Sequence, residues 1–425
     1  MKQWRTWLAC ISIFLTCFLW LSPKVSEPFW GHHEWNGVWY GQIAKNYLRI
    51  GLIETKGAQV LNADPFTQDW WIHTHHPATY PLLLAGWFAT FGVSEASARI
   101  LSIVATSSGF IGFFLLLNRI FKSEVSALLY LLIPLTTPLL LYYGSMPVSE
   151  ILLLALVAFA YLSYSKNLKR ENDISTLILL FLILITEWPG FWVVSWLWVS
   201  EFFSKRRKTL IWGIPLVGFL AYGLVFGHIV LTHNNSVAEL QSIFQTRFSV
   251  SAQPYTTYEW FHVLATRTKA FWGLPMLLLA SLGIGVAGIK DRAKLWWYIT
   301  LLAAGWSHIF VFRNITWYHD YMLLHTVPAM IIIGGGAVKF LKNKVGTRLT
   351  ILLLFGALLF TLKSTQPFFI ALSEMEPHKA CVETGMAINQ SPTISSVTWN
   401  SENAFTCPPF TNYYADKNYT IIKSD

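Results

Sequence analysis

The feature that most constrains this chain is a series of eleven apolar runs, most of them long enough to cross a lipid bilayer. A membrane-spanning helix needs about 20 mostly apolar residues. Only 12% of the 425 residues are charged, about half the share of an average soluble protein. The sequence therefore predicts an all-α polytopic membrane protein with about eleven transmembrane helices. The runs are 7–21, 97–118, 125–141, 147–165, 174–187, 190–203, 209–232, 271–288, 295–312, 321–338 and 349–364.

Basic residues are concentrated in short segments that alternate with longer, more acidic ones. Lysine and arginine accumulate in the short cytoplasmic loops of membrane proteins. This pattern predicts a multi-pass inner-membrane protein with a cytoplasmic N-terminus, and it explains the net charge of +9 without nucleic acid as a partner. The basic segments are 2–5, 119–122, 166–170, 205–208, 290–294 and 339–348.

The first outer loop, 23–96, is predicted to contain helices that lie at the membrane surface. Residues 81–93 are apolar but too short to span a bilayer, so they predict an interfacial helix. Gly37 and Gly51 bracket a second such helix over 38–50. Glu95 and Arg99, four residues apart, are expected to pair on the following helix.

The chain is predicted to divide into a transmembrane domain, 1–364, and a small extracytoplasmic α/β domain, 365–425. Polar, β-like runs at 395–399 and 419–422 indicate strands in the second part. Cys381 and Cys407 can form a disulfide if this domain faces an oxidising compartment. The other two cysteines, Cys10 and Cys17, lie inside the first apolar run and are expected to pack there.

Ionisable residues gather at the predicted outer ends of the helices. A charge within the bilayer costs about 2.5–3.5 kcal/mol on insertion scales, so such residues are candidates for function. We expect an outward-facing cavity that keeps them hydrated or paired. Two alternatives stay open: Glu150 can cap its helix, and Glu187 can pair with Arg313.

Three histidines, His73, His75 and His76, invite a metal site. Alternation along an extended segment brings only His73 and His75 to one side, and no thiol lies near. The sequence therefore predicts no metal site and no cofactor, with a divalent metal as the less favoured alternative. It contains no glycine-rich phosphate loop, HExxH or CxxC motif either.

These residues together resemble the membrane transferases of glycosyltransferase family 39. The resemblance rests on an outer loop that begins with an acid, continues into Gln42–Leu48, and then reads His-His-Pro-x-x-Tyr-Pro-Leu-Leu-Leu-Ala-Gly from His75. The family includes protein O-mannosyltransferases and the aminoarabinose transferase of lipid A. The resemblance implies the type-C fold and a polyprenyl-phosphate sugar donor.

The resemblance also implies roles for individual residues. Glu34 matches the general base that acts on the acceptor, and Glu150 matches a second outer acid. His76 matches the position that faces the donor phosphate, and Tyr321 matches a residue near the donor. Cationic groups for the phosphate are expected among the histidines, Arg313, Arg267 and Lys269. The predicted substrate-binding residues are His33, Asn36, His75, His76, Tyr80, Glu187, Arg313, His319, Asp320 and Tyr321.

The sequence thus predicts a cell-envelope glycosyltransferase with an extracytoplasmic active site. It would move a sugar from a polyprenyl-phosphate carrier to a lipid, glycan or protein acceptor, with inversion. The alternative is a membrane protein that binds or transports a lipid or polysaccharide without transferring sugar. A non-catalytic scaffold for envelope assembly is the third possibility.

Overall fold

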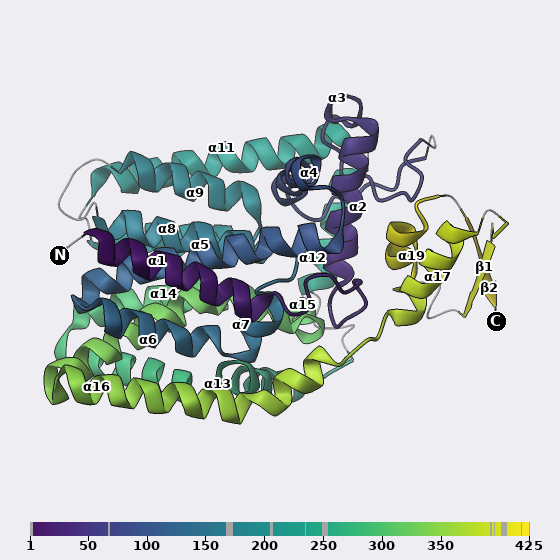
Figure 1. The fold of residues 1–425 in the computed structure, drawn as a ribbon. Coiled ribbons are helices and arrows are strands. Elements are labelled where there is room, and N and C mark those ends of the chain that lie inside the picture. Colours follow the sequence, from purple (N-terminus) through teal and green to yellow (C-terminus); the bar gives the residue numbers. More distant parts are fainter. Residues whose placement is uncertain are drawn as a thin grey trace.

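The computed structural model is a bundle of long helices with a small unit attached at one end (Figure 1). It describes residues 3–66, 69–166, 173–204, 207–233, 235–248, 254–391, 393–394, 396–400, 406–417 and 419–424. Part of the predicted basic segments 166–170 and 205–208, and the first residue of the predicted strand 395–399, lie outside these ranges.

Each predicted apolar run is mostly helical. The helices that cover the runs are α1 (Gln3–Leu21), α5 (Glu95–Phe121), α6 (Glu124–Leu135), α7 (Pro138–Tyr143), α8 (Ser149–Lys166), α9 (Ile174–Thr186), α10 (Gly190–Ser204), α11 (Lys208–Thr232), α13 (Thr257–Lys290), α14 (Arg292–Val311) and α16 (Val327–Ser373).

By length and composition, five described helices can each cross a membrane, and three shorter apolar helices accompany them. The five are Trp4–Leu21, Glu95–Phe121, Lys208–Thr232, Thr257–Lys290 and Asp320–Ser373, and the shorter ones are Glu124–Leu135, Ser149–Ser165 and Ile174–Thr186. The number eleven therefore stays a prediction.

Helix α16 covers most of the predicted run 321–338 and all of the run 349–364, and it is sharply kinked between them. Gly346 has a φ of 80°, a conformation that glycine adopts without steric cost, and helical geometry resumes after it. The second half continues to Ser373, beyond the predicted domain boundary at 364. We call this end of the bundle the Gly346 end.

The opposite end, which we call the α2 end, carries α2 (Trp35–Ile50), α3 (Leu52–Thr55) and α4 (Thr79–Phe91). Helix α2 runs across the direction of the long helices (Figure 1), as a helix at a membrane surface would. The prediction that it starts after Gly37 is wrong by three residues. Gly37 lies inside the helix and does not mark its start. The position is glycine for a packing reason, because a β-carbon there would come within 2.7 Å of the Phe29 ring.

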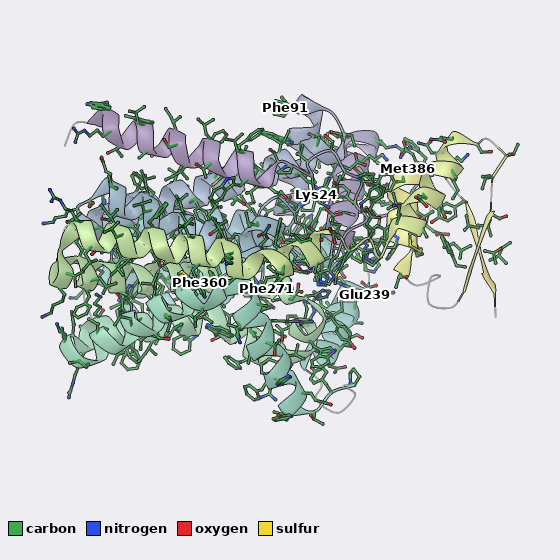
Figure 2. The ribbon with its side chains drawn as sticks, turned by 60° about the horizontal axis from the view of Figure 1, so that its bottom comes forward. Lys24, Phe91, Glu239, Phe271, Phe360 and Met386 are labelled. Atoms are coloured by element: carbon green, nitrogen blue, oxygen red, sulfur yellow. A yellow bond between two sulfur atoms is a disulfide. The ribbon has the colours of Figure 1, made fainter. Side chains whose placement is uncertain are left out.

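Short elements close the α2 end between the long helices. They are α12 (Ser236–Phe248), α15 (Arg313–Tyr318) and the 3-10 helix η2 (Asp320–Thr326). Figure 2 shows Lys24, Phe91 and Glu239 at this end, whereas Phe360 lies along the bundle. Phe360 is half-exposed, as are many apolar side chains on α11 and α16, which suits surfaces that face lipid.

The C-terminal unit lies beyond the α2 end (Figure 1) and contains α17 (Lys379–Gln390), α19 (Pro408–Ala415) and strands β1 (Ser396–Asn400) and β2 (Thr420–Ser424). The two strands pair in parallel. Phe410 and Tyr413 share an apolar cluster with Tyr47 of α2. The carboxylate of Asp416 accepts ion pairs from Lys45 and Arg49, at 2.9 and 2.8 Å, so it ties this unit to α2.

A disulfide between Cys381 and Cys407 links α17 to the start of α19 across 26 residues. A covalent link of this loop length is expected to stabilise by about 3–4 kcal/mol, mainly by restricting the unfolded chain. We expect Cys407→Ser to increase proteolysis of the C-terminal unit, measured by limited proteolysis with mass spectrometry. Cys10→Ser is the control and should leave the cleavage rate unchanged; equal cleavage of both variants would contradict the stabilising role.

Candidate functional site

A cavity of about 250 Å³ opens at the α2 end. Three elements from distant parts of the chain converge on it: α2, the histidine-rich segment before α4, and the region from α15 to η2. Helix α12 adds Arg247. The described residues that line it are Trp35, Asn36, Trp39, Tyr40, His73, His75, His76, Arg247, Asn314, Ile315, Tyr318, His319 and Tyr321.

His76 and Glu187 form a hydrogen-bonded pair beside this cavity. The Nδ1 of His76 lies 2.8 Å from Oε1 of Glu187, and the carboxylate is almost completely buried. The backbone of His76 is fixed because its carbonyl accepts a hydrogen bond from Gln59. The sequence left open that Glu187 pairs with Arg313. In the structure Glu187 pairs with His76 instead.

Further donors surround the Glu187 carboxylate. Ser149 donates its hydroxyl at 2.6 Å, and the backbone N–H of Trp188 donates at 3.0 Å. Burial alone would raise the pKa of Glu187, but His76 and these donors lower it below its ordinary value. Glu187 is therefore an ionised acceptor, and His76 donates its Nδ1–H to it; the neutral imidazole in this tautomer has its lone pair on Nε2.

Glu150 is buried next to this pair, at the start of α8. Its Oε2 lies 3.3 Å from the Ser149 hydroxyl, whose proton is directed to the closer Glu187, and the Tyr40 hydroxyl lies 3.2 Å from the same serine oxygen. Glu150 is not among the residues that line the cavity. Its predicted supporting role in catalysis stays a prediction, and its position fits an influence through Ser149 and Glu187.

The other two histidines of the segment are uncharged. Burial lowers the pKa of His75 to about 3 and that of His73 well below its ordinary value. They can offer a neutral N–H to a ligand but no positive charge. Among the described lining residues there is one arginine, Arg247, and no lysine.

Glu34 lies outside the cavity lining, in a partly buried ion pair with the buried Arg99 of α5 at 2.6 Å. Its other oxygen accepts the backbone N–H of Gly31 at 2.7 Å. The expected pair of Glu95 with Arg99 is wrong, because the guanidinium turns toward Glu34 and the carbonyls of Val25 and Glu27. The role of Glu34 as general base stays a prediction.

The remaining predicted site residues are divided. Asn36, His75, His76, His319 and Tyr321 line the cavity. Tyr80 is buried with its hydroxyl 3.3 Å from Ser102, Arg313 lies over the ring of Trp260, and Arg267 donates to the carbonyls of Thr316 and Trp317. His33 and Asp320 form a cluster behind the wall that His319 and Tyr321 build.

Sequence reasoning missed Arg247, Trp39 and Tyr40. Arg247 lies in a polar segment between two apolar runs, and no pattern in that segment indicates which way its side chain points. Trp39 and Tyr40 fall on a helix that was predicted, and the helical period from Asn36 places Tyr40 on the same face. That spacing could have identified Tyr40.

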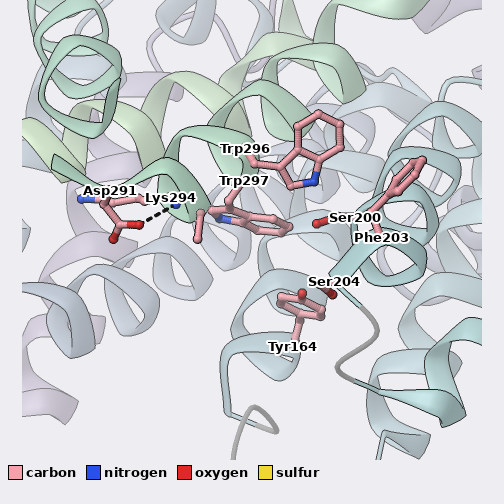
Figure 3. A pocket seen from close by; sticks show the side chains of 9 residues that line it. Tyr164, Ser200, Phe203, Ser204, Asp291, Lys294, Trp296 and Trp297 are labelled. Carbon is pink, nitrogen blue, oxygen red and sulfur yellow. Dashed lines mark hydrogen bonds between the residues drawn. The ribbon is translucent and has the colours of Figure 1, made fainter. Parts of the chain in front are cut away.

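A second, larger cavity of about 710 Å³ lies at the Gly346 end (Figure 3). The rings of Tyr164 and Trp297 stack in it, and Lys294 and Asp291 border it. A neighbouring cavity of about 320 Å³ carries Lys290, Lys339 and Lys344. Neither has a histidine among its described lining residues, whereas four histidines line the cavity at the α2 end, so we place the candidate active site there.

The fold and part of the sequence match known membrane transferases. Residues 75–186 match the model of the family described as dolichyl-phosphate-mannose-protein mannosyltransferase. This segment includes His75, His76, Tyr80 and Glu150, and it ends directly before Glu187. No curated protein sequence matches the chain.

Solved structures of membrane transferases share the fold. ArnT from Cupriavidus metallidurans bound to undecaprenyl phosphate superposes with a TM-score of 0.67 at 12% identity, over 98% of this chain and 86% of ArnT. Its apo state gives 0.61 with the same identity and coverage. The Archaeoglobus fulgidus oligosaccharyltransferase tethered to an acceptor peptide gives 0.65 at 10% identity, over 100% of this chain and 64% of that one. The chain has the type-C fold of membrane glycosyltransferases, as the resemblance predicted.

The ion pair between Glu34 and Arg99 generates a stability prediction. Glu34→Ala leaves a buried guanidinium with carbonyl acceptors only, and removing one partner of a buried pair costs about 3–5 kcal/mol. We expect a loss near the lower limit, measured as a shift of the unfolding midpoint in detergent. Glu34→Gln keeps an acceptor and should lose less; a Glu34→Ala protein as stable as wild type would contradict this structural role.

Proposed function

We propose that the protein is an integral-membrane glycosyltransferase that moves a sugar from a polyprenyl-phosphate donor to an acceptor at the α2 end. The observation that carries the proposal is the cavity there, which Arg247 and His76 both line, with Glu187 hydrogen-bonded to His76 beside it. The family match over residues 75–186 and the fold shared with ArnT support the same class of reaction.

Arg247 is the proposed contact for the donor phosphate. A guanidinium stays protonated at any physiological pH and binds phosphate oxygens with two parallel hydrogen bonds. The neutral His75 can add a further N–H donor. The lipid chain of the donor would leave the cavity toward the exposed apolar surfaces of the bundle.

His76 is the proposed general base, with Glu187 as the residue that orients it. The ionised carboxylate holds Nδ1–H, so Nε2 is free to accept the proton of the acceptor nucleophile. This differs from the prediction of Glu34, whose two carboxylate oxygens are occupied by Arg99 and Gly31. Glu150 would influence the pair electrostatically.

The proposed reaction is a single displacement with inversion at the anomeric carbon. The acceptor oxygen or nitrogen forms a bond to that carbon and passes its proton to His76. The bond from the carbon to the phosphate oxygen breaks, and the polyprenyl phosphate leaves as a stabilised anion that needs no strong acid. Arg247 would balance the charge that develops on it.

The distribution of basic residues supports an extracytoplasmic position for the α2 end. Lys290, Lys339 and Lys344 lie together at the Gly346 end, which is where a positive-inside topology expects them in the cytoplasm. The N-terminus begins at the same end (Figure 1), so it would be cytoplasmic and the C-terminal unit extracytoplasmic. Sugars on that side of the membrane come from lipid-linked donors, because nucleotide sugars remain in the cytoplasm.

Arg247→Ala is expected to weaken binding of polyprenyl phosphate. A hydrogen bond to a charged group is worth about 1.5–3 kcal/mol, which corresponds to roughly a 10–150-fold increase in Kd. The measurement is a titration of the purified protein in nanodiscs. Lys56→Gln is the control, because it removes an exposed charge directly after α3. Arg313→Ala tests the cation that was predicted from the sequence. An unchanged Kd for Arg247→Ala would exclude it as the phosphate contact.

Sugar transfer tests the base directly. Removal of a general base typically slows a reaction by about 10²–10⁴-fold. We expect this loss in His76→Gln, a smaller loss in Glu187→Gln, and transfer by Glu34→Gln at a rate close to wild type, measured with labelled polyprenyl-phosphate sugar. The opposite order would return the role to Glu34. Lipid binding without transfer by the wild-type protein would favour a lipid transporter or binding protein.

A further inference from the structure

We propose that His32, His33 and Asp320 bind a divalent transition-metal ion of the zinc class. His32 and His33 belong to the turn before α2, and Asp320 begins η2. One ligand atom from each residue lies within 4.8 Å of the others. The proposal is independent of sugar transfer, since it concerns a cluster behind the cavity wall.

The separations between the ligand atoms fit coordination. The Nε2 of His32 lies 3.2 Å from Oδ2 of Asp320, and the Nε2 of His33 lies 3.3 Å from Oδ1. Zinc bonds to histidine nitrogen and carboxylate oxygen measure about 2.0–2.2 Å, which puts neighbouring ligands of a tetrahedral site about 3.3 Å apart. Small shifts of the side chains would bring all three to bonding distance.

The Nε2 atom of His33 gives a second, independent indication. This atom is buried, and its contact with Oδ1 of Asp320 at 3.3 Å does not have the geometry of a good hydrogen bond; the described residues offer it no better one. His33 is only 8% exposed, so water does not readily compensate the missing bond. A buried nitrogen without a partner is costly unless a ligand satisfies it. A metal ion between His33 and Asp320 would do so.

The backbone around the cluster is held in place. The carbonyl of His32 accepts a hydrogen bond from Tyr142 at 2.9 Å, and the carbonyl of His33 accepts one from the Asn36 side chain at 3.1 Å. His33 has a φ of 61°, which non-glycine residues adopt at some cost. Tyr143 donates its hydroxyl to Asp320. Metal ligands are commonly oriented by such outer hydrogen bonds.

Two imidazoles and one carboxylate are ligands that suit zinc, and they leave a fourth position for water. His32 is partly exposed, so the ion and its water have access from solvent. The ring of His33 packs against His319 and Tyr321, each with 5.3 Å between centroids, and both residues line the cavity. The ion would therefore fix the turn that precedes α2 against η2, as a positioning element for the cavity wall.

Metal content and affinity test this proposal without reference to activity. Tag-free protein in detergent is stripped with EDTA, dialysed against Zn²⁺ or Co²⁺, and analysed by mass spectrometry of the metals and by the visible spectrum of Co²⁺. We expect about one ion per chain and a tetrahedral Co²⁺ spectrum. His33→Ala should lose the spectrum and weaken Zn²⁺ binding at least tenfold.

Two more variants keep the result interpretable. His32→Ala removes a partly exposed ligand and should also weaken binding at least tenfold while the protein stays folded. His262→Ala, an exposed histidine on α13, is the matched control and should leave binding unchanged. Wild-type protein without stoichiometric Zn²⁺, or affinity unchanged in both His32→Ala and His33→Ala, would overturn the proposal. Loss of sugar transfer alone would not bear on it.

Discussion

The hydrogen bond between His76 and Glu187 is the interaction on which the α2 end depends. Glu187 follows α9 and is almost completely buried, so its charge requires donors. His76 supplies one from the segment before α4, and Ser149 supplies another from the start of α8. The two hydrogen bonds thus join the first outer loop, α8 and the end of α9 at one carboxylate. The same geometry that satisfies a buried carboxylate leaves an imidazole nitrogen available at the cavity.

Much of the fold could be predicted because each long helix has its own apolar signal. Gly51, with a φ of 98°, ends α2 where the sequence places its end. The start of α2 could not be predicted, because Gly37 suggested a helix boundary. The position is glycine because the Phe29 ring packs against it, and the local sequence does not reveal this contact. The continuation of α16 to Ser373 could not be predicted either, because the composition changes at 365, inside the helix.

The candidate site was predicted in its location more than in its contacts. Histidines and acids at predicted helix ends identified the α2 end because charges are costly in a bilayer. Which charges pair depends on the tertiary structure. Arg99 pairs with Glu34 and not with Glu95, although Glu95 is only four residues away in the sequence. Arg247 could not be found for the same reason, since only the packing of α12 brings it to the cavity.

The most direct test of this account is where the donor lipid binds. Photo-crosslinking with a diazirine-bearing polyprenyl phosphate in nanodiscs, followed by peptide mapping, reports the site without requiring activity. The account predicts labelled peptides from α2, the segment around His76, or α15 and η2. Labelling concentrated around Tyr164 and Trp297, in the cavity at the Gly346 end, would contradict it.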